Sequence, residues 1–354
     1  MTHYKIALMP GDGIGPELTQ ATLKVLDGAQ KKFGLNLNLI TANAGDEVLK
    51  QHGVALPEDS LQTIKQSHAC LKGPVGETAA DVIVKLRQIF DLYANIRPLK
   101  AYPHAPVANP NIDMIFVREN TEDVYKGIEF TIGTDTTICL RVITRKNCER
   151  IAQKAFQTAR LRNGKKKVTA IHKANVMRVT DGLFKTVCAE TAKQYPDIQY
   201  NELYVDAASM HLIRKPEDFD VLCTCNMFGD ILSDEAAQLI GGLGMAPGAN
   251  IGENFALFEP IHGCAPDIAG KHIANPISMI LSAKMMLDWL GERYNDTQCL
   301  AAASAIETAI IKTLANGPVV ADLGGKATTE NMAQAIADAL TAEPNTKTTT
   351  TTTT

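Results

Sequence analysis

The chain has 354 residues, of which 45% are apolar and 21% charged, and its formal net charge at pH 7 is −4. The length allows two domains or one large α/β domain, and the composition is that of a soluble globular enzyme. The slightly acidic balance gives no electrostatic basis for binding nucleic acid or an anionic membrane. No apolar run approaches the roughly 20 residues that a membrane span requires.

Short apolar strands alternate with helical patterns along the chain, which predicts a largely parallel, open α/β sheet. The predicted strands are 5–9, 36–42, 114–118, 167–172, 221–225 and 256–258. The predicted helices are 16–33, 59–67, 79–90, 148–162, 182–194, 230–239, 276–290, 298–316 and 329–342.

Three local features complete the layout. The segment 130–145 is rich in Thr and β-branched residues around a glycine turn, which predicts a protruding hairpin whose free edges a partner subunit covers. The tail from residue 343 ends in seven threonines and is predicted to be disordered. The eight cysteines lack paired spacing, and Cys223 and Cys225 lie in an apolar run. Reduced thiols in the core of a cytoplasmic protein are the natural interpretation.

The loop 10–16, P-G-D-G-I-G-P, resembles a dinucleotide-binding fingerprint only superficially. Pro16 stands where that fingerprint needs its last glycine, and no acidic residue ends a second strand about 20 residues later. A tight strand-to-helix turn with proline in the first helical turn explains the loop.

The segment 226–234, N-M-F-G-D-I-L-S-D, follows an apolar strand and ends in two carboxylates four residues apart. Residues at i and i+4 share a helix face, so Asp230 and Asp234 point the same way. Paired carboxylates suit Mg²⁺ or Mn²⁺, whereas a solvated helix face is the alternative for an isolated pair. Asp206 is a third carboxylate, at the end of the alternating stretch that begins at residue 203.

Three arginines accompany apolar elements: Arg87 in a predicted helix, Arg97 in Y-A-N-I-R-P and Arg118 at a strand end. One such arginine is usually a surface residue. Three together predict a site for a polyanion, because guanidinium groups bind carboxylates through two hydrogen bonds.

Two candidates for proton transfer lie in polar loops after strands. Tyr125 fits a general acid, with an amphipathic packing role as the alternative. Lys173, in H-K-A-N-V-M with Asn175, fits a general base beside a cation, and otherwise is a surface lysine.

Together these segments resemble the β-decarboxylating dehydrogenases, the family of isocitrate, homoisocitrate, 3-isopropylmalate and tartrate/D-malate dehydrogenases. The resemblance covers the chain to about residue 340 and rests on five motifs in the family's order. They are D-L-Y-A-N-I-R-P (91–98), V-R-E-N-T-E-D-V-Y-K-G-I-E (117–129), H-K-A-N-V-M (172–177), N-M-F-G-D-I-L-S-D (226–234) and F-E-P-I-H-G-C-A-P (258–266).

The resemblance implies a role for each candidate. The arginines Arg87, Arg97 and Arg118, aided by Asn175, would bind the carboxylates of a 2-hydroxy acid bearing a β-carboxylate. Lys173 would remove the hydroxyl proton and Tyr125 would protonate the enolate. Asp206, Asp230 and Asp234 would hold Mg²⁺ or Mn²⁺, with Lys173 and Asp206 belonging to the neighbouring subunit's site in a homodimer.

The family fold implied is an open, mostly parallel sheet in a large cofactor domain (1–98 and 250–342) and a small dimerisation domain (99–249), with an intersubunit arm at about 126–146. The cofactor would lie along 259–276, where the resemblance assigns binding to Glu259, His262, Gly263, Ala265, Asp267, Ile268 and Asn275. Asp267 would accept from a free ribose 2′-hydroxyl and repel a phosphate, which favours NAD over NADP.

The substrate is predicted from two signals that disagree. The loop R-E-N-T-E-D-V-Y-K-G-I-E resembles the isocitrate branch, which makes isocitrate the first expectation. The helix before Arg87 carries Asp81 and Ile83 where isocitrate enzymes show serine and asparagine, and Thr78 is the remaining donor for a γ-carboxylate. Ile83 and Val84 equally suit an apolar substituent, so 3-isopropylmalate stays open beside homoisocitrate and tartrate/D-malate. A non-catalytic regulatory subunit is the alternative of another class.

Overall fold

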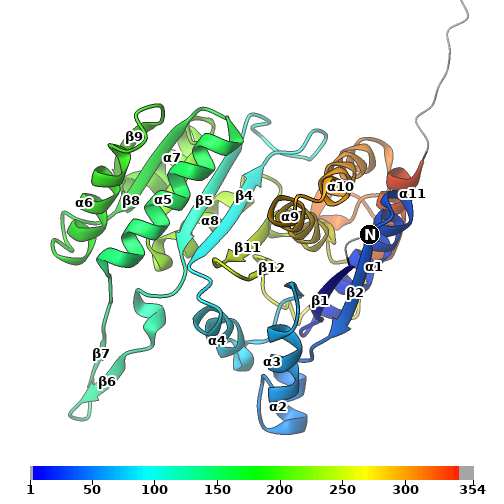
Figure 1. Ribbon diagram of the computed structural model, residues 1–354, viewed down its shortest axis with the longest axis horizontal. Coiled ribbons are helices and arrows are strands. Elements are labelled where there is room, and N and C mark those ends of the chain that lie inside the picture. Colours follow the sequence, from blue (N-terminus) through cyan, green and yellow to red (C-terminus); the bar gives the residue numbers. More distant parts are fainter. Residues whose placement is uncertain (1–2, 343–354) are drawn as a thin grey trace, which may run out of the picture.

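The computed structural model describes residues 3–342, so the predicted disordered tail from residue 343 lies outside the described part of the chain. Ten strands form one open sheet, and two more form a separate hairpin. Helices cover both faces of the large sheet (Figure 1). The mixed α/β architecture with a mostly parallel sheet confirms the predicted fold class.

The large sheet has the strand order β2-β1-β3-β12-β11-β4-β5-β10-β8-β9. Neighbours are parallel except at β12–β11, β11–β4 and β4–β5, which are antiparallel. The block β2-β1-β3-β12 therefore runs opposite to the block β5-β10-β8-β9. The strands are β1 His3–Met9, β2 Asn36–Thr41, β3 Ala69–Lys72, β4 Ala94–Lys100, β5 Asp113–Glu119, β8 Lys167–His172, β9 Gln199–Tyr204, β10 Val221–Thr224, β11 Pro247–Ile251 and β12 Ala256–Pro260.

Strand β4 lies at the centre of the sheet and separates two sites. Because side chains alternate along a strand, Arg97 faces one side, which we call the front face, whereas Ile96 and Pro98 face the rear. Helix α8 packs on β4 and β5 at the front, and α9 packs on β11 and β12 at the rear. The sheet continues across the predicted domain boundary near residue 98, so the division into two domains stays a prediction.

The helices begin and end at recognisable signals. Pro16 lies in the first turn of α1, and Gly34 ends that helix in the left-handed conformation at φ 66°. Asp296 begins α10 by accepting from the backbone N–H of Gln298 at 2.9 Å. The helices are α1 Gly15–Phe33, α2 Asp46–His52, α3 Glu58–Lys65, α4 Asp81–Ile89, α5 Arg145–Arg162, α6 Thr180–Ala192, α7 Val205–Arg214, α8 Asn226–Gln238, α9 Ile277–Tyr294, α10 Thr297–Asn316 and α11 Thr329–Thr341.

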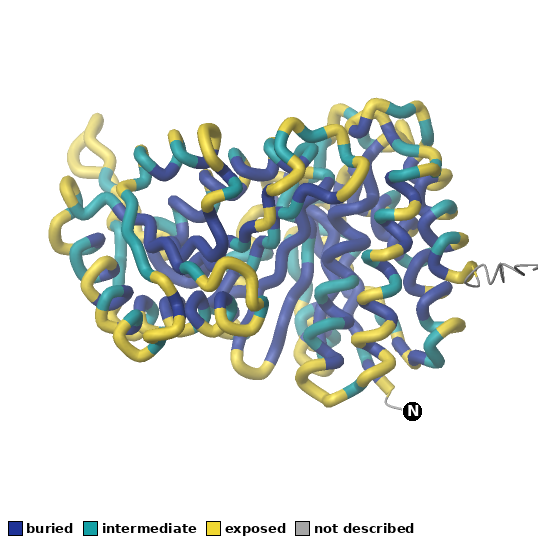
Figure 2. Tube along the Cα trace, turned by 90° about the horizontal axis from the view of Figure 1, so that it is seen from above, coloured by how far each residue is buried: buried dark blue, intermediate teal, exposed yellow. Residues whose placement is uncertain are grey.

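The buried residues lie mainly along the large sheet and on the helix faces that pack against it. Figure 2 shows buried chain running through the middle of the molecule and exposed turns around it. All four residues of β10 are buried, as a strand covered on both faces requires. Cys223 in β10 and Cys225 directly after it are buried, and all eight cysteines are free thiols, but Cys139 is exposed and Cys264 only half-buried. None of the helices within residues 3–342 has the length and apolar character needed to cross a bilayer.

The predicted ribbon is present as a hairpin of β6 (Glu129–Ile132) and β7 (Thr136–Cys139), which projects from the body of the molecule (Figure 1). Its apolar side chains Phe130 and Ile132 are 47% and 53% exposed. Residue 145 belongs to α5 rather than to the ribbon, because Thr144 caps that helix by accepting from the N–H of Asn147.

Candidate active site

Two of the predicted arginines and two of the predicted metal ligands meet on the front face. Asp230 and Asp234 lie one turn apart on α8, which begins one turn earlier than predicted, at Asn226. Both carboxylates face Arg97: its Nη2 donates to Asp230 Oδ1 at 3.0 Å and its Nη1 to Asp234 Oδ1 at 3.1 Å. Arg118, near the end of β5, donates to the same Asp230 oxygen at 2.6 Å.

This cluster fixes the charge of Asp230. Burial alone would raise the pKa of Asp230, but the guanidinium groups of Arg118 and Arg97 outweigh burial and lower that pKa to about 2. Burial, reinforced by the charge of Arg97, lowers the pKa of Arg118 to about 9. Asp234 keeps a raised pKa because burial dominates over its contact with Arg97. The pKa values of the two carboxyl groups are therefore shifted in opposite directions, and Asp230 is the one that stays ionised at lower pH.

Tyr125 joins the cluster from a short 3₁₀ turn, Val124–Lys126. Its hydroxyl donates to Asp230 Oδ2, and its ring centroid lies 5.2 Å from the guanidinium carbon of Arg118. Burial raises the pKa of Tyr125, Asp230 raises it further, and Arg118 opposes both. Asp123 holds the turn against α8 by accepting from the N–H of Met227 at 3.1 Å. The phenol is thus held protonated beside a carboxylate, as a general acid requires.

Arg87 reaches the front face from α4 and is held by a residue that the sequence did not single out. Its Nε donates to Asn250 Oδ1 at 3.1 Å. The same oxygen accepts from Asn95 at 3.0 Å and from Asn120 at 2.8 Å. Asn250 is fully buried in β11. The sequence signal that could have identified Asn250 is an asparagine within an apolar segment, because a buried amide side chain needs hydrogen-bond partners.

Lys72 and Glu259 form a buried ion pair next to Asn250. Lys72, at the end of β3, donates to Glu259 Oε2 at 2.7 Å, and Asn250 donates to the other carboxylate oxygen at 2.8 Å. Burial favours the neutral form of Glu259, but Lys72 and Arg87 outweigh it and lower its pKa. Glu259 was predicted to bind the cofactor, and in the structure it anchors the front surface to β3.

A cavity of about 380 Å³ opens above these groups, and we call it the front pocket. Its size suits a small ligand. Of the predicted residues, it brings together Arg87, Arg97, Glu259, His262, Gly263 and Ala265. Ile83 of α4 also lines it, beside Val75 and Ala80.

Several predicted residues do not line the front pocket. The Thr78 hydroxyl donates to Asp46 Oδ1, a contact that no local pattern predicts. Asp267 and Ile268 lie just beyond the lining residues, on the loop that follows Pro266. Asn275 is buried, and its Oδ1 accepts from the N–H of Ile277 at the start of α9.

Lys173 and Asp206 form a separate pair with each other. Asp206 is the first-turn acid of α7 rather than the end of a strand, because β9 ends at Tyr204. Asn175 is exposed in the turn after β8. Within residues 3–342 no group of three metal-ligating side chains forms, so one chain does not assemble Asp206 with Asp230 and Asp234.

The residues present fit a divalent cation in part. Asp230 and Asp234 converge on the two ends of one guanidinium, and their side chains are 34% and 48% exposed. Two hard oxygen donors one helical turn apart, still reachable from solvent, match the ligand preference of Mg²⁺ and Mn²⁺. The cluster supplies two carboxylates, so any further ligand would come from outside it.

Comparison with known proteins places the whole chain in one group. The family model described as isocitrate/isopropylmalate dehydrogenase matches residues 5–336. The 3-isopropylmalate/3-methylmalate dehydrogenase of Methanocaldococcus jannaschii is 52% identical over 337 residues, which cover 94% of this chain and 98% of the relative. The isocitrate/homoisocitrate dehydrogenase of Thermus thermophilus is 44% identical over 343 residues, 95% of this chain and 98% of the relative.

A solved structure agrees with these relatives. The isocitrate dehydrogenase from Methylococcus capsulatus superposes with a TM-score of 0.90 at 43% identity, over 96% of this chain and 100% of that one. The resemblance inferred from five motifs is thereby confirmed along the whole described fold. The chain belongs to the isocitrate/isopropylmalate dehydrogenase family.

Proposed function

We propose that this protein is an NAD-dependent and divalent-metal-dependent dehydrogenase that oxidises and decarboxylates a 3-alkylmalate, with 3-isopropylmalate as the first choice. The observation that carries the proposal is Ile83, whose apolar side chain lines the front pocket together with Arg87. A γ-carboxylate would need a donor there. Asp81 is exposed outside the pocket, and Thr78 already bonds to Asp46.

The comparisons favour the same choice over the isocitrate expectation. Relatives named 3-isopropylmalate dehydrogenase reach 48–52% identity, whereas those named homoisocitrate or isocitrate/homoisocitrate dehydrogenase reach 44%. The loop that contains Tyr125 resembles the isocitrate branch. In the proposed mechanism, however, that loop acts on the carbon that reacts in every substrate of the family, so it does not distinguish the substrates. The substituent that distinguishes the substrates lies toward Ile83.

We call Arg87, Arg97, Arg118, Tyr125, Asp230 and Asp234 the front cluster, and we assign each of them a task. Arg97, Arg118 and Arg87 bind the two carboxylates of the substrate and orient C2 toward the nicotinamide. Lys173 of a second subunit would accept the hydroxyl proton, and NAD⁺, when bound, would supply the oxidant that takes the C2 hydride. The β-carboxylate departs as CO₂, and the electron pair left behind forms an enolate. Tyr125 donates its proton to the enolate carbon, since its raised pKa keeps the phenol protonated.

A cation would complete this arrangement. Asp230 and Asp234 would hold Mg²⁺ or Mn²⁺ together with Asp206 of the second subunit. When bound, the ion supplies Lewis-acid polarisation of the substrate oxygen. Without it, Arg97 and Arg118 neutralise Asp230 and keep the two carboxylates from repelling one another.

A homodimer is part of the proposal, because Lys173 and Asp206 pair with each other and do not join Asp230 and Asp234 within one chain. Apolar side chains are exposed near this pair and on α8: Val179 is 85% exposed, Ile213 67% and Ile231 60%. Burial of such side chains favours association of two copies. The hairpin of β6 and β7 offers a further apolar surface to a second subunit.

The initial rate of NADH formation with Mg²⁺ tests the substrate, using 3-isopropylmalate, 3-methylmalate, isocitrate, homoisocitrate and D-malate in parallel. We expect kcat/KM to be highest for a 3-alkylmalate, and Ile83→Ser to shift the ratio toward isocitrate by about 10- to 100-fold. Ile89→Ser on the same helix, exposed and outside the pocket, is the matched control. A preference for isocitrate overturns the substrate, and no turnover with any acid would support a regulatory subunit instead.

A further inference from the structure

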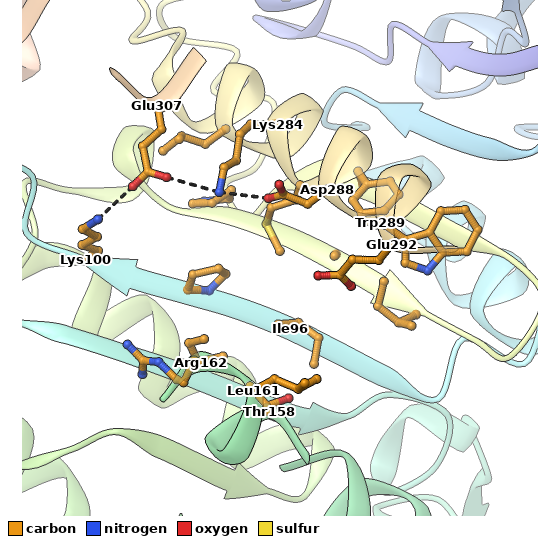
Figure 3. Close-up of a pocket in the computed structure, with 18 of the residues that line it drawn as sticks. Ile96, Lys100, Thr158, Leu161, Arg162, Lys284, Asp288, Trp289, Glu292 and Glu307 are labelled. Carbon is orange, nitrogen blue, oxygen red and sulfur yellow. Dashed lines mark hydrogen bonds and ion pairs between the residues drawn. The ribbon is translucent and has the colours of Figure 1, made fainter. Parts of the chain in front are cut away.

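The rear face of the sheet carries a second cavity, of about 470 Å³, which we call the rear cavity (Figure 3). Its floor is the reverse side of β4, β11 and β12, where Ile96, Ala249 and Phe258 turn away from the front pocket. One wall is α5 and the other is α9. Only the thickness of one sheet separates the two cavities.

Most charges that line the rear cavity neutralise one another. Lys100 bonds to Glu307 at 2.8 Å, and Lys284 bonds to Asp288 at 2.9 Å and to Glu307 at 3.2 Å. Figure 3 shows these four side chains as one chain of contacts at one end of the cavity. Arg162 pairs with Asp113 and Asp220.

Two charged lining residues have no such contact within the described chain. Lys154 of α5 makes no hydrogen bond or ion pair, and neither does Glu292 of α9. They belong to opposite walls and carry opposite charges. In Figure 3 the carboxylate of Glu292 points into the cavity. Burial lowers the pKa of Lys154, and the negative charge of Glu292 counters that effect, so the two groups sense each other without touching.

Between these charges lies an apolar surface. Trp289 and Met285 of α9 face Leu161 of α5 across the sheet floor. Trp289 also packs edge-on against Phe258, with ring centroids 6.2 Å apart. A molecule that satisfies the whole cavity needs an anion for Lys154, a cation for Glu292 and an apolar body for Trp289.

We propose that the rear cavity binds a free α-amino acid with an apolar side chain, its carboxylate on Lys154 and its ammonium group on Glu292. Charge complementarity favours this class, since an amino acid engages both charges, whereas a fatty acid engages only Lys154 and an alkylamine only Glu292. A ligand that joins Lys154 to Glu292 links α5 to α9 behind the sheet.

The rear cavity and the front pocket share one layer of strands. Arg97 and Asn95 lie on the same strand as Ile96 and Pro98 but on its opposite face. If the amino acid lowers the affinity for substrate by some factor, substrate must lower the affinity for the amino acid by the same factor. This reciprocity is measurable without turnover.

Trp289 is the only tryptophan of the chain, so its fluorescence reports on the rear cavity directly. We would titrate the full-length protein with L-leucine, L-methionine and L-phenylalanine, and with 4-methylpentanoate and 3-methylbutylamine, which each lack one charge. We expect a saturable change with the amino acids, and affinities at least about tenfold weaker with the single-charge analogues.

Lys154→Met and Glu292→Gln should each weaken amino-acid binding about tenfold or more while leaving basal turnover unchanged. Lys312→Met, at an exposed position on α10, is the matched control and should bind as the wild type does. Circular dichroism verifies that each variant is folded. No saturable signal at millimolar concentration, equal affinity for the single-charge analogues, or unaltered binding in both variants overturns the proposal. Because binding is read by fluorescence, a wrong substrate assignment at the front pocket leaves this test intact.

Discussion

The hydroxyl of Tyr125 donates to Oδ2 of Asp230, while Asp230 Oδ1 accepts from Arg97 and Arg118. The proposed proton donor and a proposed metal ligand are therefore two ends of one hydrogen-bonded unit. A cation held by Asp230 would compete with the phenol for this carboxylate, and Tyr125 would then be free to donate to the substrate.

Changing Tyr125 to Phe removes the proton donor and keeps the ring against Arg118. We expect kcat to fall about 100-fold or more, because general acid catalysis contributes at least that much. Metal-dependent substrate binding, measured by calorimetry, should persist. Tyr294→Phe, at a surface position, is the control. Turnover like that of the wild type would refute the assigned role.

Changing Asn250 to Ala leaves the donors of Arg87, Asn95 and Asn120 without their shared acceptor. We expect a loss of about 1–3 kcal/mol in unfolding free energy, since buried donors left unpaired are costly. KM should rise more than kcat falls, because Arg87 loses its orientation. Urea unfolding and steady-state kinetics measure the two effects, with the exposed Asn111→Ala as control. A change confined to kcat would contradict a positioning role.

Glu259 makes stability depend on acid pH. Its pKa in the folded chain lies below the ordinary value because Lys72 and Arg87 outweigh burial. The stabilisation is therefore complete above the unfolded pKa of about 4.3 and is lost as the pH falls through the folded pKa. Glu259→Gln should be less stable than the wild type at pH 7, and the gap should narrow below about pH 4. A gap that is independent of pH between 7 and 3 would exclude this linkage.

Exchanging Asp267 for Lys together with Ile268 for Tyr should move cofactor preference from NAD toward NADP. The present carboxylate would repel a 2′-phosphate, and the new side chains would attract it. The ratio of kcat/KM for the two cofactors is the measurement. Lys271→Gln, exposed on the same loop, serves as the control. An unchanged ratio would place ribose recognition elsewhere.

The elements that the sequence predicted are those with strong periodicity. The four buried residues of β10 and the amphipathic pattern of α1 are encoded locally, so their positions came out nearly as observed. Strands β3, β4, β9 and β11 were missed. Strand β3 has only four residues and ends in Lys72, β4 contains Pro98, and β11 contains Pro247 and Gly248, all of which are poor strand signals.

The sequence predicted those site residues whose relative positions follow from their spacing within one helix. It did not predict contacts between residues on strands that are far apart in the chain. The i, i+4 rule placed Asp230 and Asp234 on one face. No local sequence pattern predicts the hydrogen bond between Asn250 and Arg87. The two residues are 163 positions apart, and they meet only because β11 lies beside β4 in the folded sheet. The contact of Thr78 was missed for the same reason. Its hydroxyl donates to Asp46 at the start of α2, a helix that the sequence pattern did not predict.

The strand order of the large sheet has a consequence for the order in which the protein can form during synthesis. Strands β5, β8, β9 and β10 arise from one continuous stretch, residues 113–224, and can pair as soon as that stretch has left the ribosome. Strand β3 must wait for β12, made almost 190 residues later, before its second edge is covered. The half of the sheet that begins the chain is thus the half completed last, and in the interval its open edge is the part of the nascent protein most in need of protection.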